Sequence, residues 1–188
     1  MIGELNIYSC YSFQNSTILI KDLCKRAHDL HLEAIALTDI NNMYGAVEFS
    51  NECHKYDIKP IFGMQGNVNV EGEIYPFLLL AKDQVGYHDL MKICSDINLS
   101  DQKAIDLEKL RLYHEHLFIL SGCKEGIVER CVLKELESEA LRYMALFKEM
   151  FKDNYYICLQ DHGIQMQKHL NERLKALAKL QGIKVCAS

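Results

Sequence analysis

Proline and tryptophan are scarce in this chain of 188 residues, which contains 2 Pro and no Trp. With 49% hydrophobic and 25% charged residues, the composition is that of a globular protein and excludes a disordered or fibrous chain. The length is enough for one substantial core, so we expect a single domain over residues 1–188.

Long apolar runs and an excess of positive charge are also missing. No apolar stretch approaches the roughly 20 residues that cross a bilayer, and the start, MIGELNIYSC, lacks the regions of a secretion signal. We therefore expect no membrane contact and a cytoplasmic location. A formal net charge of -5 gives no overall attraction to phosphate, so we expect DNA to be held by another part of any larger protein.

Several catalytic motifs are absent. No GxxxxGK[ST] or GxGxxG follows a predicted strand, which excludes the common phosphate loops. The eight cysteines form no CxxC pair, and we expect most to be reduced, buried thiols. Ser121-Gly122-Cys123 follows a predicted strand, so Cys123 is a candidate nucleophile, but no His is placed to act as its base. We favour a partly buried thiol at a strand end.

Short apolar runs with β-branched or aromatic residues alternate with stretches of helical periodicity. The runs predict strands at residues 5–9, 33–38, 58–62, 74–81, 117–121, 155–159 and 183–187. The first helical stripe begins at Ile20, with Ser16 or Thr17 as its N-cap. Residues 128–151 predict one helix of about seven turns, and Gly182 predicts the C-cap of the last helix. Residues 95–109 predict a surface excursion with a short helix.

This alternation predicts an α/β fold in which parallel strands are joined by right-handed crossovers. We favour a distorted, barrel-like sheet over an open one because polar or sulfur-bearing residues follow nearly every predicted strand. Loops at the C-terminal ends of parallel strands converge on one face, so these residues are expected to be neighbours. They are Tyr8, Ser9, Asp39, Asn41, Asn42, Gln65, Cys123, Asp161 and His162.

Several segments, in this order and spacing, carry a resemblance. They are LNIYSCYSFQNS from residue 5, ALTDINNMYGAVEF from residue 36, KPIFGMQGNV from residue 59, YPFLLLAK from residue 75, LSGC from residue 120 and LQDHG from residue 159. Together they resemble the polymerase and histidinol phosphatase (PHP) domain at the N-terminus of the bacterial DNA polymerase III alpha subunit. The resemblance spans essentially the whole chain. It implies a distorted (β/α)7-like barrel of mainly parallel strands, with up to three metal ions at the C-terminal face in metal-binding members.

The resemblance also places the family's metal ligands on this sequence. Seven ligand positions are visible, and they carry Asn6, Tyr8, Asn15, Ile40, Gln65, Pro76 and Cys123. Only Cys123 matches the family's side chain, and the resemblance puts the last two ligand positions past Ser188. Ile and Pro donate nothing to a cation, while Asn and Gln lack the negative charge that balances a metal cluster. We therefore expect no metal and no cofactor here, and a packed, internally hydrogen-bonded replacement.

The remaining polar groups are expected to be structural. Asp39 precedes Asn41 and Asn42 in a strand-to-helix turn, which favours turn or N-cap hydrogen bonding. Asp161 and His162 lie in an Asp-His-Gly turn and are expected to bond within that loop. His114 and His116 precede a strand, on the opposite face from the expected site. The isolated histidines are expected to be solvated. The mixed charges of residues 124–149 are expected to form the exposed face of the long helix, which could equally face a partner domain.

The resemblance thus implies a non-catalytic, structural PHP domain within a longer polymerase chain that binds Mg in its own active site. The expected partners are the rest of that chain and a proofreading exonuclease or other replisome subunits, with DNA reached only through the parent chain. One alternative is a metal-dependent phosphoesterase or 3′-5′ exonuclease with a diverged site at Asp39, Cys123, Asp161 and His162. Another is a free-standing adaptor with no polymerase attached.

Overall fold

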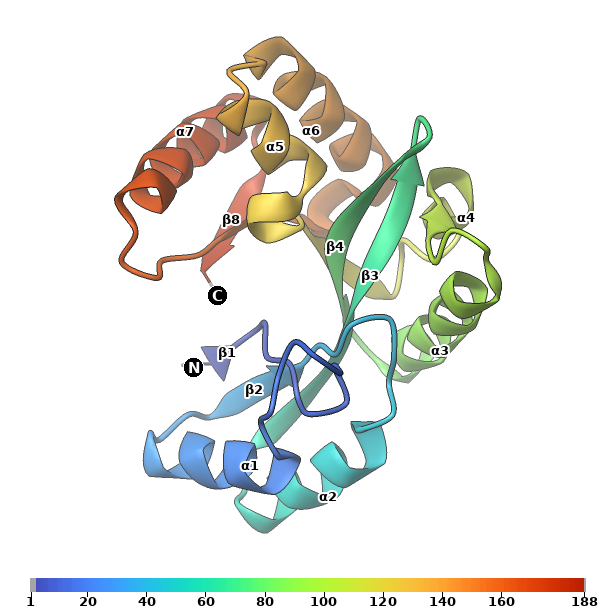
Figure 1. Cartoon of the computed structure of the whole chain (residues 1–188), viewed down its shortest axis with the longest axis vertical. Helices are drawn as coiled ribbons and strands as arrows, with labels where there is room; N and C mark the ends of the chain where they lie inside the picture. Colours follow the sequence, from blue (N-terminus) through green and yellow to red (C-terminus); the bar gives the residue numbers. More distant parts are fainter. Residues whose placement is uncertain (1–2, 188) are drawn as a thin grey trace.

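The computed structural model describes residues 3–187, which form one curled sheet with helices around its outside (Figure 1). The strands are β1 Gly3–Glu4, β2 Ala34–Leu37, β3 Lys59–Val70, β4 Glu73–Ala81, β5 Ile105–Asp106, β6 Leu117–Leu120, β7 Tyr155–Leu159 and β8 Lys184–Ala187. The α-helices are α1 Ile20–Asp29, α2 Ala46–Lys55, α3 Gln84–Leu99, α4 Leu107–Arg111, α5 Ile127–Leu133, α6 Glu137–Phe151 and α7 Gln165–Gln181.

The strand order is β1-β2-β3-β4-β6-β7-β8, with β5 pairing β3. Most pairings are parallel, as expected, but β4 runs antiparallel to both β3 and β6. The sheet curls into a half-barrel whose end strands, β1 and β8, lie on the same side of the molecule (Figure 1). The predicted α/β class and distorted barrel are confirmed.

The exception to parallel pairing is a long hairpin. Residues Lys59 to Phe62 of β3 pair in parallel with β2, and the strand then continues to Val70 in antiparallel register with β4. Glu71 and Gly72 form the turn with positive φ angles of 55° and 90°, as in a type I′ turn. The prediction that this strand ends at residue 62 was therefore wrong.

Three clusters of buried side chains lie against the sheet. One is formed by α1, α2 and β2, where the helices bury Ile20, Cys24 and Ala27, and Phe49 and Cys53. The largest is formed by the hairpin, β6, β7 and the remaining long helices. The third joins residues of β2, β4, β6 and β7, namely Ala36, Leu78, Leu80, Leu120 and Cys158. All eight cysteines are free, as expected, but only Cys24, Cys53 and Cys158 are buried and the others are half-buried.

The N-terminal elements differ from the sequence prediction. The first strand is Gly3–Glu4 rather than residues 5–9, because that later segment departs from the ladder and forms loop contacts such as Thr38 N–H to Ile7 O. Helix α1 has Leu19 at its N-cap without a side-chain cap. The Ser16 hydroxyl instead donates to Tyr8 O.

The predicted long helix is two helices, α5 and α6. Glu135 has a φ of 60°, its N–H bonds Val132 O, and the Leu136 N–H bonds Cys131 O, which is a Schellman ending. Residues 95–99 continue α3 rather than starting an excursion, although the short helix α4 follows as expected. Gly182 ends α7 in the left-handed conformation, with a φ of 61°, as predicted.

Candidate functional site

Side chains from three successive segments of the curled sheet meet beyond the end of β2. The Tyr8 hydroxyl donates a short hydrogen bond to Gln65 Oε1. Ile40 and Gln65 form an isolated parallel bridge, and Asn41 N donates to Gln65 O over 2.8 Å. Three of the expected ligand positions therefore lie together, and the phenol and the amide satisfy each other.

Asn6 links this group to a set of thiols. Its Nδ2 donates to Cys123 Sγ over 3.7 Å, and its Oδ1 accepts from Thr38 Oγ1 over 3.2 Å. The Cys123 thiol in turn contacts Cys158 Sγ at 3.6 Å. These polar atoms are arranged to bond one another across β2, β6 and β7.

Pro76 is held against the loop that carries Cys123. A Cβ built on Gly122 would lie 1.8 Å from the Pro76 carbonyl oxygen, so only glycine allows this approach. Asn15 is the exception among the seven positions. It is exposed, and its Nδ2 donates over 3.1 Å to Phe13 O within the same loop.

Both ionisable groups in this cluster are held neutral at pH 7. Burial raises the pKa of the Tyr8 phenol. The Cys158 thiol, as hydrogen-bond partner, and then burial raise the pKa of Cys123. A nucleophilic cysteine needs a lowered pKa and a nearby base, so these surroundings do not favour the nucleophile alternative for Cys123.

Asp39 is buried, with 1% of its surface exposed, and ties two loops together. Its carboxylate accepts from Ser9 N and Ser9 Oγ, each over 2.7 Å, and from Ser12 Oγ. The expectation that it bonds within its own turn was wrong. Asn42 has that role, because its Oδ1 accepts from Tyr44 N over 3.2 Å.

Asp161 bonds within its own exposed loop, as expected, whereas the backbone of His162 bonds to the first turn of α7. Gly163 N donates to Asp161 Oδ1 over 2.8 Å, and His162 N donates to Gln167 Oε1 over 2.9 Å. Within residues 3–187, no hydrogen bond joins either residue to the cluster of Asn6, Tyr8 and Cys123. The expectation that all strand-end residues are neighbours therefore fails for this loop.

His114 and His116 precede β6, at the opposite end of that strand from Cys123. His116 Nδ1 lies 2.8 Å from Asp83 Oδ2, and His114 Nδ1 lies 3.0 Å from Arg111 O. The isolated histidines are exposed, as predicted, at positions 28, 31, 54, 88 and 169.

Sequence reasoning missed one ionisable group behind the Cys123 loop. Glu129 was expected among exposed charges, but only 1% of its surface is exposed. Its Oε1 accepts a short hydrogen bond from Ser121 Oγ, which itself accepts from Cys158 N over 2.9 Å, while its Oε2 has no hydrogen-bond partner. Burial raises the pKa of Glu129 to about 8. The sequence did carry a signal for this burial, because Glu129 lies three residues before Val132 and beside Val128, on the apolar face of the helix.

The side chains gathered at these positions do not fit a cluster of divalent ions. The oxygens of Asn6 and Gln65 already accept hydrogen bonds from Thr38 and Tyr8, and Ile40 has no donor atom. Among residues 3–187, no group of three or more His, Cys, Asp or Glu side chains could hold a metal ion. Hard divalent cations prefer carboxylate oxygens, and Zn²⁺ binds imidazoles, carboxylates or thiolates; this cluster offers only thiols, and the raised pKa of Cys123 disfavours the thiolate.

Comparison with protein families decides the ancestry of this fold. The model of the PHP domain matches residues 4–162. The chain belongs to the PHP domain family. The segments that carry the resemblance, residues 5–163, fall within that match except for their last residue, Gly163.

Curated relatives of this PHP chain are DNA polymerase III alpha subunits. The protein of Borreliella burgdorferi is 31% identical over 199 residues, covering 98% of this chain and 17% of its own length. The protein of Treponema pallidum is 33% identical and that of Bacillus subtilis 31%, covering 96% and 98% of this chain and 17% of each relative. The chain therefore spans about one-sixth of the length of the relatives that it matches.

Solved structures share the fold of this PHP domain. An amidohydrolase from Chromobacterium violaceum superposes with a TM-score of 0.62 at 9% identity, over 100% of this chain and 85% of that one. A protein from Bifidobacterium adolescentis, described as a candidate metal-dependent phosphoesterase, gives 0.56 at 11% identity, over 100% and 86%. At these identities the likeness concerns the fold alone. No helix within residues 3–187 has the length and apolar character needed to cross a membrane.

Proposed function

We propose that this chain is the PHP domain of a bacterial replicative DNA polymerase, that it has lost the metal site of its family, and that it serves as a structural module. Support for the polymerase comes from the alpha-subunit relatives, each about six times the matched length. The parent protein is then a cytoplasmic DNA-directed DNA polymerase. Its Mg-dependent active site lies outside this domain, and DNA reaches the domain only through the parent chain.

The loss of metal rests on one observation: the gathered ligand positions hydrogen-bond one another. Polar atoms that would otherwise face a cation bond one another instead. Tyr8 hydrogen-bonds to Gln65, and Asn6 hydrogen-bonds to Cys123 and Thr38. A phosphoesterase needs ions to polarise the phosphate and to supply hydroxide, and these side chains supply neither ligand charge nor a general base. The module would bind the rest of the polymerase and a proofreading exonuclease or other replisome subunits.

Elemental analysis tests the lost site directly. The purified protein, dialysed against metal-free buffer and measured for Mn, Zn and Fe, is expected to hold far less than one equivalent of each. A parallel assay with a generic phosphodiester and added Mn is expected to give no turnover above the rate of an Asn6→Ala, Gln65→Ala variant. One retained equivalent of metal, or hydrolysis abolished by those substitutions, would support the enzyme reading instead.

The polymerase assignment has a separate test. The encoded sequence is expected to continue beyond Ser188 into a chain of the length of the relatives, and the purified full chain is expected to extend a primed template in the presence of Mg. A reading frame without polymerase sequence would favour a free-standing adaptor.

A further inference from the structure

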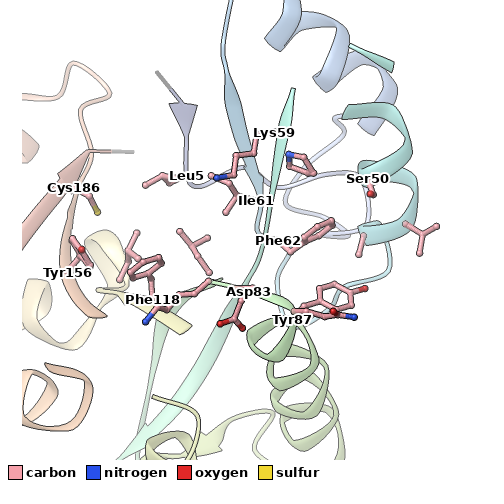
Figure 2. Close-up of a pocket in the computed structure, with 18 of the residues that line it drawn as sticks. Leu5, Ser50, Lys59, Ile61, Phe62, Asp83, Tyr87, Phe118, Tyr156 and Cys186 are labelled. Carbon is pink, nitrogen blue, oxygen red and sulfur yellow. The ribbon is translucent and has the colours of Figure 1, made fainter. Parts of the chain in front are cut away.

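A wide apolar groove of about 770 Å³ runs from the concave side of the half-barrel, past the start of β3, to helices α2 and α3 (Figure 2). Tyr156 and Cys186, from β7 and β8, lie on one side of it, and Phe62 and Ser50, from β3 and α2, lie on the other. Leu5 lies between them. The groove thus extends from β7 and β8, past Leu5, to β3 and α2.

Two charged groups at the rim, Lys82 and Asp83, are already engaged within the domain. Lys82 Nζ donates to Glu115 O over 2.8 Å and to Asn154 Oδ1 over 3.2 Å. Asp83 accepts from Gly86 N over 2.9 Å and pairs with His116. Small-molecule sites orient their ligand with a few convergent polar groups, and these two charged groups already bond within the domain. An apolar floor with a polar rim is the pattern of a surface that covers another polypeptide.

The sheet itself is open beside this groove. Within residues 3–187, β1 pairs only with β2 and β8 only with β7. Val185 of β8 is 43% exposed, on the face of the sheet opposite to Cys186, although its strand partner Ile157 is fully buried. Unpaired edges next to exposed apolar surface are normally covered in native proteins. Because Cys186 lines the groove, chain that follows β8 would start at the groove wall.

The relatives contain much additional sequence that could cover the groove, since the matched region is only 16–17% of the length of each of them. We propose that the groove is the docking surface for the segment of the same polymerase chain that follows Ser188. This inference rests on the proposed function. A second copy of the domain or a small apolar ligand would be a different occupant.

Thiol labelling of a groove residue tests the proposal. Val47 lines the groove from α2 and is 70% exposed, so a Val47→Cys substitution places an accessible thiol there without disturbing the core. The rate of reaction with N-ethylmaleimide, read by peptide mass spectrometry, is compared between the full polymerase chain and the 188-residue chain. We expect the thiol at position 47 to react at least about tenfold more slowly in the full chain. Equal rates would overturn the proposal.

Cys24, which is fully buried, reports in the same experiment whether each chain is folded. Should it react in the short chain, the comparison is made within the full chain against Leu99→Cys, at a residue that is 84% exposed. A rate at position 47 equal to that control overturns the proposal. So does protection in the short chain that rises with its concentration, because a second copy then fills the groove. A full chain that synthesises DNA with position 47 freely labelled refutes this inference alone; a gene ending at Ser188 refutes both proposals.

Discussion

At the scale of single residues, Asp39 is expected to stabilise the fold rather than to bind metal. Asp39→Asn keeps the shape of the side chain but removes the charged carboxylate that accepts hydrogen bonds from Ser9 and Ser12. This substitution is therefore expected to lower the free energy of unfolding by about 2 kcal/mol. Urea unfolding at pH 7 measures this. The matched control, Asp161→Asn, lies in an exposed loop and is expected to change stability by less than about 0.5 kcal/mol. Equal effects at both positions would contradict the structural role of Asp39.

Glu129 makes stability depend on pH. Its folded pKa of about 8 lies above the usual value of 4.5, so the folded state keeps a proton that the unfolded state releases. The associated stability is fully present below pH 4.5 and is lost as the pH rises toward 8. The slope from this group is up to about 1.4 kcal/mol per pH unit.

Glu129→Gln removes this titration while keeping the side-chain shape. Urea midpoints measured at pH 5 and pH 8 are expected to differ less for the variant than for the parent protein. At pH 5 the variant is expected to be slightly less stable, because its amide N–H takes the place of an oxygen that has no hydrogen-bond partner. A variant with the parent's full pH dependence would show that Glu129 is not the titrating group.

At the scale of elements, two helices end at a residue in the left-handed conformation, one at a glycine and the other at a glutamate. Gly182 and Glu135 have φ angles of 61° and 60°, but only glycine adopts this region without strain. Gly182→Ala is expected to lower the free energy of unfolding by about 1 kcal/mol, and Glu135→Gly to raise it by about 0.5 kcal/mol. Thermal unfolding of both variants measures the two signs. Destabilisation by Glu135→Gly would indicate that the Glu135 side chain contributes more than its backbone costs.

The helices and strands could be predicted where the local sequence pattern determines them, and not where the structure depends on long-range pairing. Buried strands such as AIAL at residues 34–37 are continuous apolar runs and were placed correctly. The break before α6 was missed because Leu133 and Leu136 continue the apolar spacing although they are 37% and 47% exposed. The antiparallel hairpin was missed because its turn, Glu71-Gly72, also fits an ordinary loop. Periodicity shows which residues are apolar, but not the register or direction of long-range pairing.

The site was predictable to the extent that it follows the segments of the resemblance. Asn6, Tyr8, Gln65 and Cys123 were named from sequence and are neighbours in space. Their other hydrogen-bond partners were not predictable, since Thr38 and Cys158 reach Asn6 and Cys123 only through the curl of the sheet. Whether the site once held metal and lost it stays a prediction.

At the scale of the whole molecule, the core of α1, α2 and β2 is connected to the largest core by β3, which pairs with β2 at one end and with β4 at the other, and by the third cluster, which extends from β2 to β7. The core of α1, α2 and β2 is the smaller of the two that are connected, and its aromatic contact with the rest includes Phe62 against Tyr87, with ring centroids 5.2 Å apart. Local opening of a small unit costs less free energy than global unfolding. We therefore expect the two regions to differ in their protection from hydrogen exchange.

Native-state hydrogen exchange is expected to show lower opening free energies for amides of α1, α2 and β2 than for those of the hairpin, β6 and β7. Phe62→Ala removes the ring that links the two regions and is expected to lower protection in the smaller core by about 2 kcal/mol, with less effect on the larger one. Leu112→Ala is the control, since that side chain is 76% exposed and is expected to alter neither region. Loss of protection by the same amount in both regions after Phe62→Ala would mean that the domain opens as one cooperative unit, with the continuous β3 strand coupling its two cores.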